Sequence, residues 1–233
     1  MVPNIILLGP AGAGKSALVE QLVSYKNYHP ISLGKILRSE NFLRTPLGGR
    51  LIRFLNAGML IDDFTANTIL FSLIQQVPTA KPFVIDGYPR NLQQAKRLKA
   101  FTVESKISID LIVELDLPLK RASERIRYQA IEDKSKEVDP VGYHPEIRSD
   151  DFVVKDHTYE AIRNRFLSYK AEIKGIRMEF EDWGKFTVID ADKPLEEVTD
   201  ALFAQVSRDD ANFQLKYKVQ RCLATDGKAT VES

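Results

Sequence analysis

The chain has 233 residues, 44% hydrophobic and 28% charged, which suffices for one α/β domain with a small insertion or for two small domains. Lys and Arg total 33 against 32 Asp and Glu, so the net charge of +1 provides no global basic field and we expect no nucleic-acid partner. The single cysteine, Cys222, excludes an internal disulfide and a cysteine-based zinc site, so we expect no structural zinc.

Short apolar runs alternate with helical patterns along the chain. Their alternation predicts a three-layer α/β sandwich with a five-stranded parallel sheet, helices on both faces and ligands at the carboxyl ends of the strands. Strands are expected at Ile5–Leu8, near Pro30–Ser32, and at Phe83–Ile85, Leu111–Leu115 and Phe186–Ile189. Helices are expected over residues 15–25, 34–40, 46–57, 62–76, 91–100, 118–129, 158–180 and 195–207.

Two segments stand outside this alternation. Residues 34–77 contain three helical patterns with no strand between them, which predicts a small helical lobe. Residues 130–157 have mixed charge, two prolines and little periodicity, which is typical of a functional loop, so we expect a mobile lid there. The remaining segments are the expected core, at 1–33, 78–129 and 158–207, and a C-terminal extension of unassigned role, at 208–233.

A glycine-rich loop joins the first expected strand to the first expected helix. Its sequence, Gly9-Pro10-Ala11-Gly12-Ala13-Gly14-Lys15-Ser16, is the Gly-x4-Gly-Lys-Ser pattern in a strand–loop–helix context. Glycines allow backbone N–H groups to converge on a phosphate, and the following helix directs its positive end to the same point. Lys15 then reaches the β- and γ-phosphates, and the Ser16 hydroxyl binds Mg²⁺. The alternative is a glycine-rich turn with an incidental lysine, but the flanking elements favour a nucleoside triphosphate site.

A second polar sequence, Asp86-Gly87-Tyr88-Pro89-Arg90, follows the third expected strand. An acidic residue at a strand end beside a phosphate loop commonly holds Mg²⁺ through water. Gly87 allows close approach of a ligand, and Arg90 offers a planar fork for a phosphate. The alternative for the same residues is a tight turn with a surface arginine, and the neighbouring phosphate loop disfavours it.

No apolar run reaches the roughly 18 residues of a membrane span, and residues 1–4 lead directly into the first expected strand. Cysteine poverty fits a reducing compartment. We therefore expect a cytoplasmic monomer with no signal peptide, no transit peptide and no membrane partner.

From about residue 3 to 207 the chain resembles the adenylate kinase family of nucleoside monophosphate kinases. The order and spacing of several short sequences carry this resemblance more than any one of them. They are the phosphate loop, Ser32–Arg38, Ala57–Ile61, Asp86–Arg90 with Gln94, Glu124–Ile126, Arg148–Asp151, Arg163–Arg165 and Asp190–Pro194.

The resemblance implies that the helical lobe binds the nucleoside monophosphate. Arg38, Arg90 and Arg163 would then hold its phosphate, while Met59, Ile61 and Gly87 would line the ribose and base. Gln94 would pair with the base edge, because a side-chain amide can donate to adenine N1 and accept from its amino group.

The resemblance also implies the ATP side of the site. Arg125 would stack on the adenine, the backbone near Lys193 would bound it, and the lid would bring Arg148, Arg163 and Arg165 onto the phosphates. Charge stabilisation of the transferring group would fall to Lys15, Arg90, Arg148 and Arg165, and Ser16 and Asp86 would hold Mg²⁺. The triphosphate would lie on Gly9, Ala11, Gly12, Ala13, Gly14, Lys15, Ser16 and Ala17.

Four residues depart from the family pattern. Leu33 and Lys35 stand where threonine and aspartate are usual, Gln129 stands in place of an arginine, and Asn91 resembles the residue at this position in the UMP–CMP kinases.

We expect reversible, Mg²⁺-dependent conversion of ATP and AMP into two ADP. The alternatives are a UMP/CMP or broad-specificity nucleoside monophosphate kinase, a P-loop kinase of another small metabolite, and a nucleotide-binding regulatory module with weakened catalysis.

Overall fold

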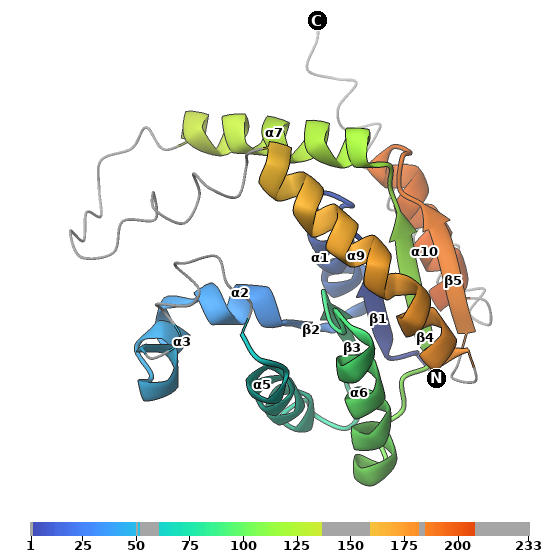
Figure 1. Cartoon of the computed structure of the whole chain (residues 1–233). Helices are drawn as coiled ribbons and strands as arrows, with labels where there is room; N and C mark the ends of the chain where they lie inside the picture. Colours follow the sequence, from blue (N-terminus) through green and yellow to red (C-terminus); the bar gives the residue numbers. More distant parts are fainter. Residues whose placement is uncertain (1, 50, 52–60, 137–158, 182–184, 208–233) are drawn as a thin grey trace, which may run out of the picture.

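The computed structural model describes residues 2–49, 51, 61–136, 159–181 and 185–207 (Figure 1). Five parallel strands form one sheet in the order β2-β3-β1-β4-β5, which confirms the predicted α/β class. The apolar runs of the three central strands, β3, β1 and β4, are buried because helices cover both faces of the sheet. The strands are β1 (Ile5–Leu8), β2 (His29–Ser32), β3 (Phe83–Asp86), β4 (Leu111–Asp116) and β5 (Lys185–Asp190).

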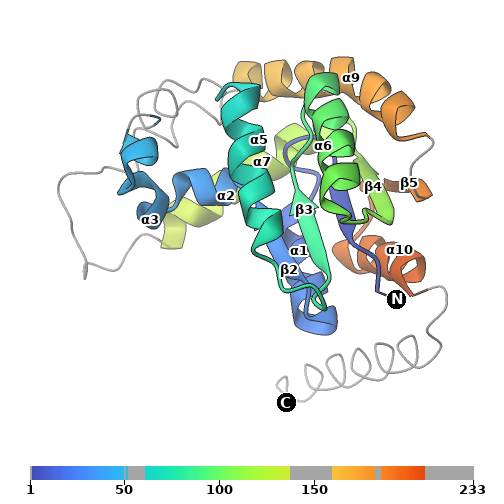
Figure 2. The same ribbon diagram turned by 90° about the horizontal axis from the view of Figure 1, so that it is seen from below.

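The helices divide between the two faces of the sheet, as Figure 2 shows for α9 and α10. One face packs mainly on α5, α6 and α9, with Leu70, Leu98 and Ile173 in its core. The other packs on α1 and α10, with Leu18 and Leu202 in its core. The helices described are α1 (Lys15–Lys26), α2 (Leu33–Arg38), α3 (Glu40–Leu43), α5 (Asp63–Gln75), α6 (Leu92–Ser105), α7 (Leu119–Lys136), α9 (Tyr159–Phe180) and α10 (Leu195–Val206).

The segment expected to be a helical lobe is helical where it is described. Helices α2, α3 and α5 lie in it, and residues 46–49 are also helical. Residues 52–60, which include the end of the expected helix 46–57, lie outside the described residues. Among the described residues between β2 and β3 there is no further strand.

Two helices continue further than their sequence patterns predict. Helix α6 runs to Ser105 rather than to residue 100, and Lys106 ends it in a left-handed conformation with φ of 57°. Helix α7 runs to Lys136 rather than to residue 129, so residues 130–136 of the expected lid are helical. Residues 137–158 of that lid lie outside the described part of the chain. No described helix combines the length and the apolar character that a membrane crossing requires.

Candidate active site

The phosphate loop lies between β1 and α1 and packs closely on its neighbours. A Cβ added at Gly9 would lie 3.0 Å from the carbonyl oxygen of Leu115, at the end of β4. A Cβ added at Gly12, where φ is +80°, would lie 2.9 Å from the carbonyl oxygen of Ala122 in α7. Gly14 precedes α1 and has no side chain to cap it. The first turn of α1 therefore presents its N–H groups to a ligand rather than to a cap.

Lys15 begins α1 and turns back over the loop. Its Nζ donates to the carbonyl oxygens of Gly9 at 2.8 Å and Pro10 at 2.9 Å. Burial lowers the pKa of Lys15 to about 8; the Asp86 carboxylate opposes this shift and the Arg90 guanidinium adds to it. Asp86 and Arg90, which come from the second motif, thus lie within electrostatic reach of Lys15 in the first. A polyphosphate placed there would replace the two carbonyls as the partner of the ammonium group.

Asp86 lies where three strand ends meet. It ends β3 and is in register with Leu7 of β1 and Ser32 of β2. Asp86 is 8% exposed, and its carboxylate accepts a hydrogen bond from Ser32 Oγ at 3.2 Å. Mg²⁺ usually keeps several water ligands and takes few from the protein, so a single carboxylate of this kind is chemically suited to it. Within the described residues, no three His, Cys, Asp or Glu side chains gather as a metal site.

The side chain of Gln94 lies beneath the loop that follows β3. It is 5% exposed; its Oε1 accepts from the backbone N–H of Arg90 at 2.8 Å, and its Nε2 donates to Asp63 Oδ1 at 2.8 Å. The guanidinium of Arg90 donates through Nε to the carbonyl oxygen of Gly87 at 3.1 Å. The loop from Gly87 to Arg90 and the first turn of α6 therefore form one hydrogen-bonded unit.

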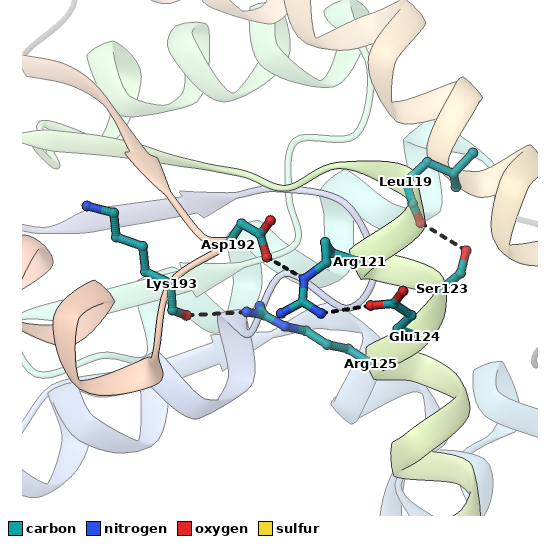
Figure 3. Close-up of polar contacts among 7 residues, drawn as sticks. All are labelled: Leu119, Arg121, Ser123, Glu124, Arg125, Asp192 and Lys193. Carbon is teal, nitrogen blue, oxygen red and sulfur yellow. Dashed lines mark hydrogen bonds and ion pairs between the residues drawn. The ribbon is translucent and has the colours of Figure 1, made fainter.

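On the other side of the phosphate loop, α7 is joined to the loop between β5 and α10 (Figure 3). Arg125 Nη2 donates to the carbonyl oxygen of Lys193 at 3.3 Å. Arg121 bridges Asp192 Oδ1 at 2.5 Å and Glu124 Oε2 at 2.7 Å. Arg125 and Lys193 were both predicted to contact one adenine, and the structure places them in direct contact.

The comparisons with known proteins agree with this arrangement. A family model described as adenylate kinase matches residues 7–185. The chain belongs to the adenylate kinase family. It is 29% identical over 203 residues to an adenylate kinase of Fusobacterium nucleatum subsp. nucleatum, covering 86% of this chain and 96% of the relative. It is 31% identical over 196 residues to that of Methylorubrum populi, with 84% and 92% covered. The adenylate kinase of Brucella anthropi is 28% identical over 196 residues, with 84% and 94% covered.

Membership of the adenylate kinase family makes the chain a phosphotransferase enzyme acting between ATP and a nucleoside monophosphate. Nucleotides are accordingly its small-molecule partners. The phosphate loop, Asp86 and the paired Arg125 and Lys193 occupy one edge of the sheet, where the strands end.

The roles expected for several other residues stay predictions, and the structure gives only their positions. Met59 and Arg148 lie outside the described residues, and Arg38 is the last residue of α2. Arg163 and Arg165 are exposed on the first turns of α9. Leu33, expected near the monophosphate base, is 5% exposed in the core, and Ile61 packs against the same core. Lys35 is exposed, with its Nζ 3.9 Å from Glu20 Oε1.

Sequence reasoning missed two charged groups in the site. Asp63 accepts from both Gln94 and Asn91, and Arg121 holds α7 to Asp192. The pair Asp62-Asp63 looks like an ordinary helix start, and Asp62 does cap α5 by accepting from the backbone N–H of Thr65. A second carboxylate directly after a cap was the only signal for Asp63, because its partners lie 28 and 31 residues away in the sequence.

Proposed function

We propose that this enzyme uses AMP as the phosphoryl acceptor, so that ATP and AMP are converted reversibly into two ADP in the presence of Mg²⁺. The observation that supports AMP as the phosphoryl acceptor concerns Gln94. Its buried amide retains one hydrogen-bond donor position and one acceptor position after its bonds to Asp63 and Arg90. Those two positions match the amino group and the ring nitrogen on the Watson–Crick edge of adenine. Relatives with the printed name adenylate kinase support the same acceptor.

In the proposed mechanism the protein supplies position and charge rather than a nucleophile. Transfer of a phosphoryl group develops charge on the oxygens of the transferring group, and cationic side chains stabilise that charge. Lys15 lies over the phosphate loop, and Arg90 follows the end of β3. Arg148 and Arg165 are proposed to complete the set. We assign no general base.

The metal is proposed to be held by Asp86, partly through water, and by the Ser16 hydroxyl. When bound, Mg²⁺ neutralises charge on the phosphate oxygens. Asp86 is suited to this role because it ends β3 beside the ends of β1 and β2, where its carboxylate accepts a hydrogen bond from the Ser32 hydroxyl. Lys35 is proposed to remain outside this group, beside Glu20.

A coupled assay of ADP formation tests the proposal, with ATP, Mg²⁺ and AMP, UMP or CMP in separate reactions. We expect kcat/KM to be highest for AMP. A higher value for UMP or CMP would assign the acceptor to pyrimidine monophosphates instead. Absence of turnover with all three, with ATP binding retained, would favour the regulatory module.

A further inference from the structure

The Gln94 amide belongs to a chain of hydrogen bonds whose directions are all determined. The backbone N–H of Gln94 donates to Asn91 Oδ1 at 2.8 Å and caps α6. This leaves Asn91 Nδ2 to donate to both carboxylate oxygens of Asp63, at 3.0 and 3.2 Å. Asp63 Oδ1 also accepts from Gln94 Nε2, and the backbone N–H of Arg90 donates to Gln94 Oε1.

Each end of the Gln94 amide therefore faces a group of fixed polarity. A backbone N–H can only donate, and a carboxylate can only accept. Turning the amide over would place its N–H₂ against the N–H of Arg90 and its oxygen against the carboxylate of Asp63. Two bonds would become two repulsive contacts in a site where Gln94 is 5% exposed, and buried polar groups without partners are strongly unfavourable. The amide is thus held in one orientation.

The orientation of the amide matters because nucleobases fall into two classes, whose pairing edges carry opposite patterns of hydrogen-bond donor and acceptor. Adenine and cytosine carry an amino donor next to a ring-nitrogen acceptor. Hypoxanthine, guanine and uracil carry a carbonyl acceptor next to a ring N–H donor. A glutamine that turns freely can pair with both kinds of edge, whereas a fixed glutamine discriminates between them.

We propose that Asp63, supported by Asn91, fixes the Gln94 amide so that the acceptor site selects nucleotides with an amino-bearing base over those with a keto base. Asp63 is a positioning residue here, because it acts through Gln94. The inference rests on the proposed function in that it takes Gln94 to contact the acceptor base. It also gives Asn91, a departure from the usual adenylate kinase sequence, a role in the site.

The test compares AMP with inosine monophosphate, which differs from AMP only in carrying the keto edge. The readout is the ratio of kcat/KM for the two acceptors, which is independent of the fraction of folded enzyme. Asp63→Asn is the informative variant, because an asparagine there can present an N–H to Gln94 and so removes one of the two contacts that oppose the reversed amide. Asp62→Asn is the matched control: it alters the neighbouring carboxylate, which contacts Thr65, and asparagine remains a good cap.

We expect the wild-type enzyme to favour AMP by about 100-fold or more, since a site built to pair with a polar edge rejects the mismatched one. Asp63→Asn should lower this ratio by roughly 10-fold, and Asp62→Asn should leave it within about 2-fold of wild type. An unchanged ratio in Asp63→Asn would overturn the inference while leaving the proposed function intact. If the wild-type enzyme instead prefers pyrimidines, the proposed acceptor is wrong, and the ratio of CMP to UMP in the same variants tests the inference separately.

Discussion

At the scale of single residues, Lys15 has a lowered pKa that makes nucleotide binding sensitive to pH. Burial lowers this pKa to about 8 in the protein without nucleotide. A bound polyphosphate would raise the pKa of Lys15. At a pH between the pKa of the free enzyme and that of the complex, the complex therefore holds more protons than the free enzyme. ATP affinity should therefore be constant below about pH 8 and fall above it, by at most about tenfold per pH unit. Calorimetry in buffers of different ionisation enthalpy should show proton uptake on binding near pH 8.5.

Lys15→Arg is the matched variant for this measurement. A guanidinium keeps its charge throughout this pH range, so the fall in affinity above pH 8 should disappear even if the affinity itself is lower. An affinity that stays constant from pH 7 to 9.5 in the wild-type enzyme would mean that binding does not change the protonation of Lys15 in this range, which contradicts the prediction.

Gly12 illustrates a position where only glycine fits. In Gly12→Ala the new Cβ would lie 2.9 Å from a backbone oxygen of α7, at a φ of +80° that L-residues rarely adopt. Because the obstructing atom is backbone, the loop must move, and we expect loss of ATP binding together with about 1–3 kcal/mol of destabilisation. Urea unfolding and binding of a non-hydrolysable ATP analogue measure the two effects.

Gly175 in α9 provides the control for that variant. A Cβ there would approach Leu92 no closer than 3.7 Å, an ordinary contact. Gly175→Ala should therefore raise the free energy of unfolding by up to about 1 kcal/mol through helix propensity, with ATP binding unchanged. Equal behaviour of the two variants would contradict the packing argument for Gly12.

At the scale of elements, α9 is held to the sheet by an ion pair as well as by apolar contacts. Glu114 in the middle of β4 is 0% exposed, and its Oε2 accepts from Arg177 Nε at 2.6 Å. The hydrogen bond to Glu114 raises the pKa of Arg177. Glu114 Oε1 and the Tyr169 hydroxyl are buried without a hydrogen bond among the described residues. The pKa of Tyr169 is raised by burial and by the nearby charge of Glu114.

Removing the arginine should therefore be costly. Arg177→Met leaves the Glu114 carboxylate buried without its partner, and we expect a loss of about 3–5 kcal/mol in the free energy of unfolding. Adding Glu114→Gln to that variant should recover part of the loss, because a neutral amide is easier to bury. Arg97→Met is the comparison: it breaks an exposed pair with Glu104 and should cost less than about 1 kcal/mol. Similar losses in Arg177→Met and Arg97→Met would show that the buried pair contributes little.

The central strands β1, β3 and β4 were predictable because each is a short apolar run that the helices on both faces of the sheet bury. The end of α7 was not, because residues 130–136 are mostly polar and are followed by the two prolines of the expected lid, which made the whole stretch look like a loop. In the site, Lys15 and Asp86 follow from local patterns. The contacts of Asp63 with Gln94 and of Glu114 with Arg177 do not, since they join helices and strands that are distant in sequence.

At the scale of the whole molecule, the two proposed base sites lie on opposite sides of the phosphate loop. One is built by α7 and the loop after β5, through Arg125 and Lys193; the other lies at the starts of α5 and α6, through Asp63 and Gln94. Lys15 and Asp86 lie between them, at the strand ends. A ligand of two adenosines joined by five phosphates should therefore contact both sides at once.

Such a ligand should stabilise the fold by mass action and protect both sides from hydrogen exchange. At a concentration of 100 times its Kd we expect about 2.7 kcal/mol of stabilisation, or a rise in Tm of roughly 5–10 °C. Slower exchange should appear in residues 61–66 and 91–95 as well as in 119–127 and 191–195. A non-hydrolysable ATP analogue alone should protect mainly the second pair of segments.

Two variants distinguish the two sides. Arg125→Ala should weaken the binding of both ligands, whereas Arg90→Ala should weaken the binding of the two-adenosine ligand far more than that of the analogue. Protection by the two-adenosine ligand that is confined to one side, at saturation, would mean that the acceptor site has been placed on the wrong elements.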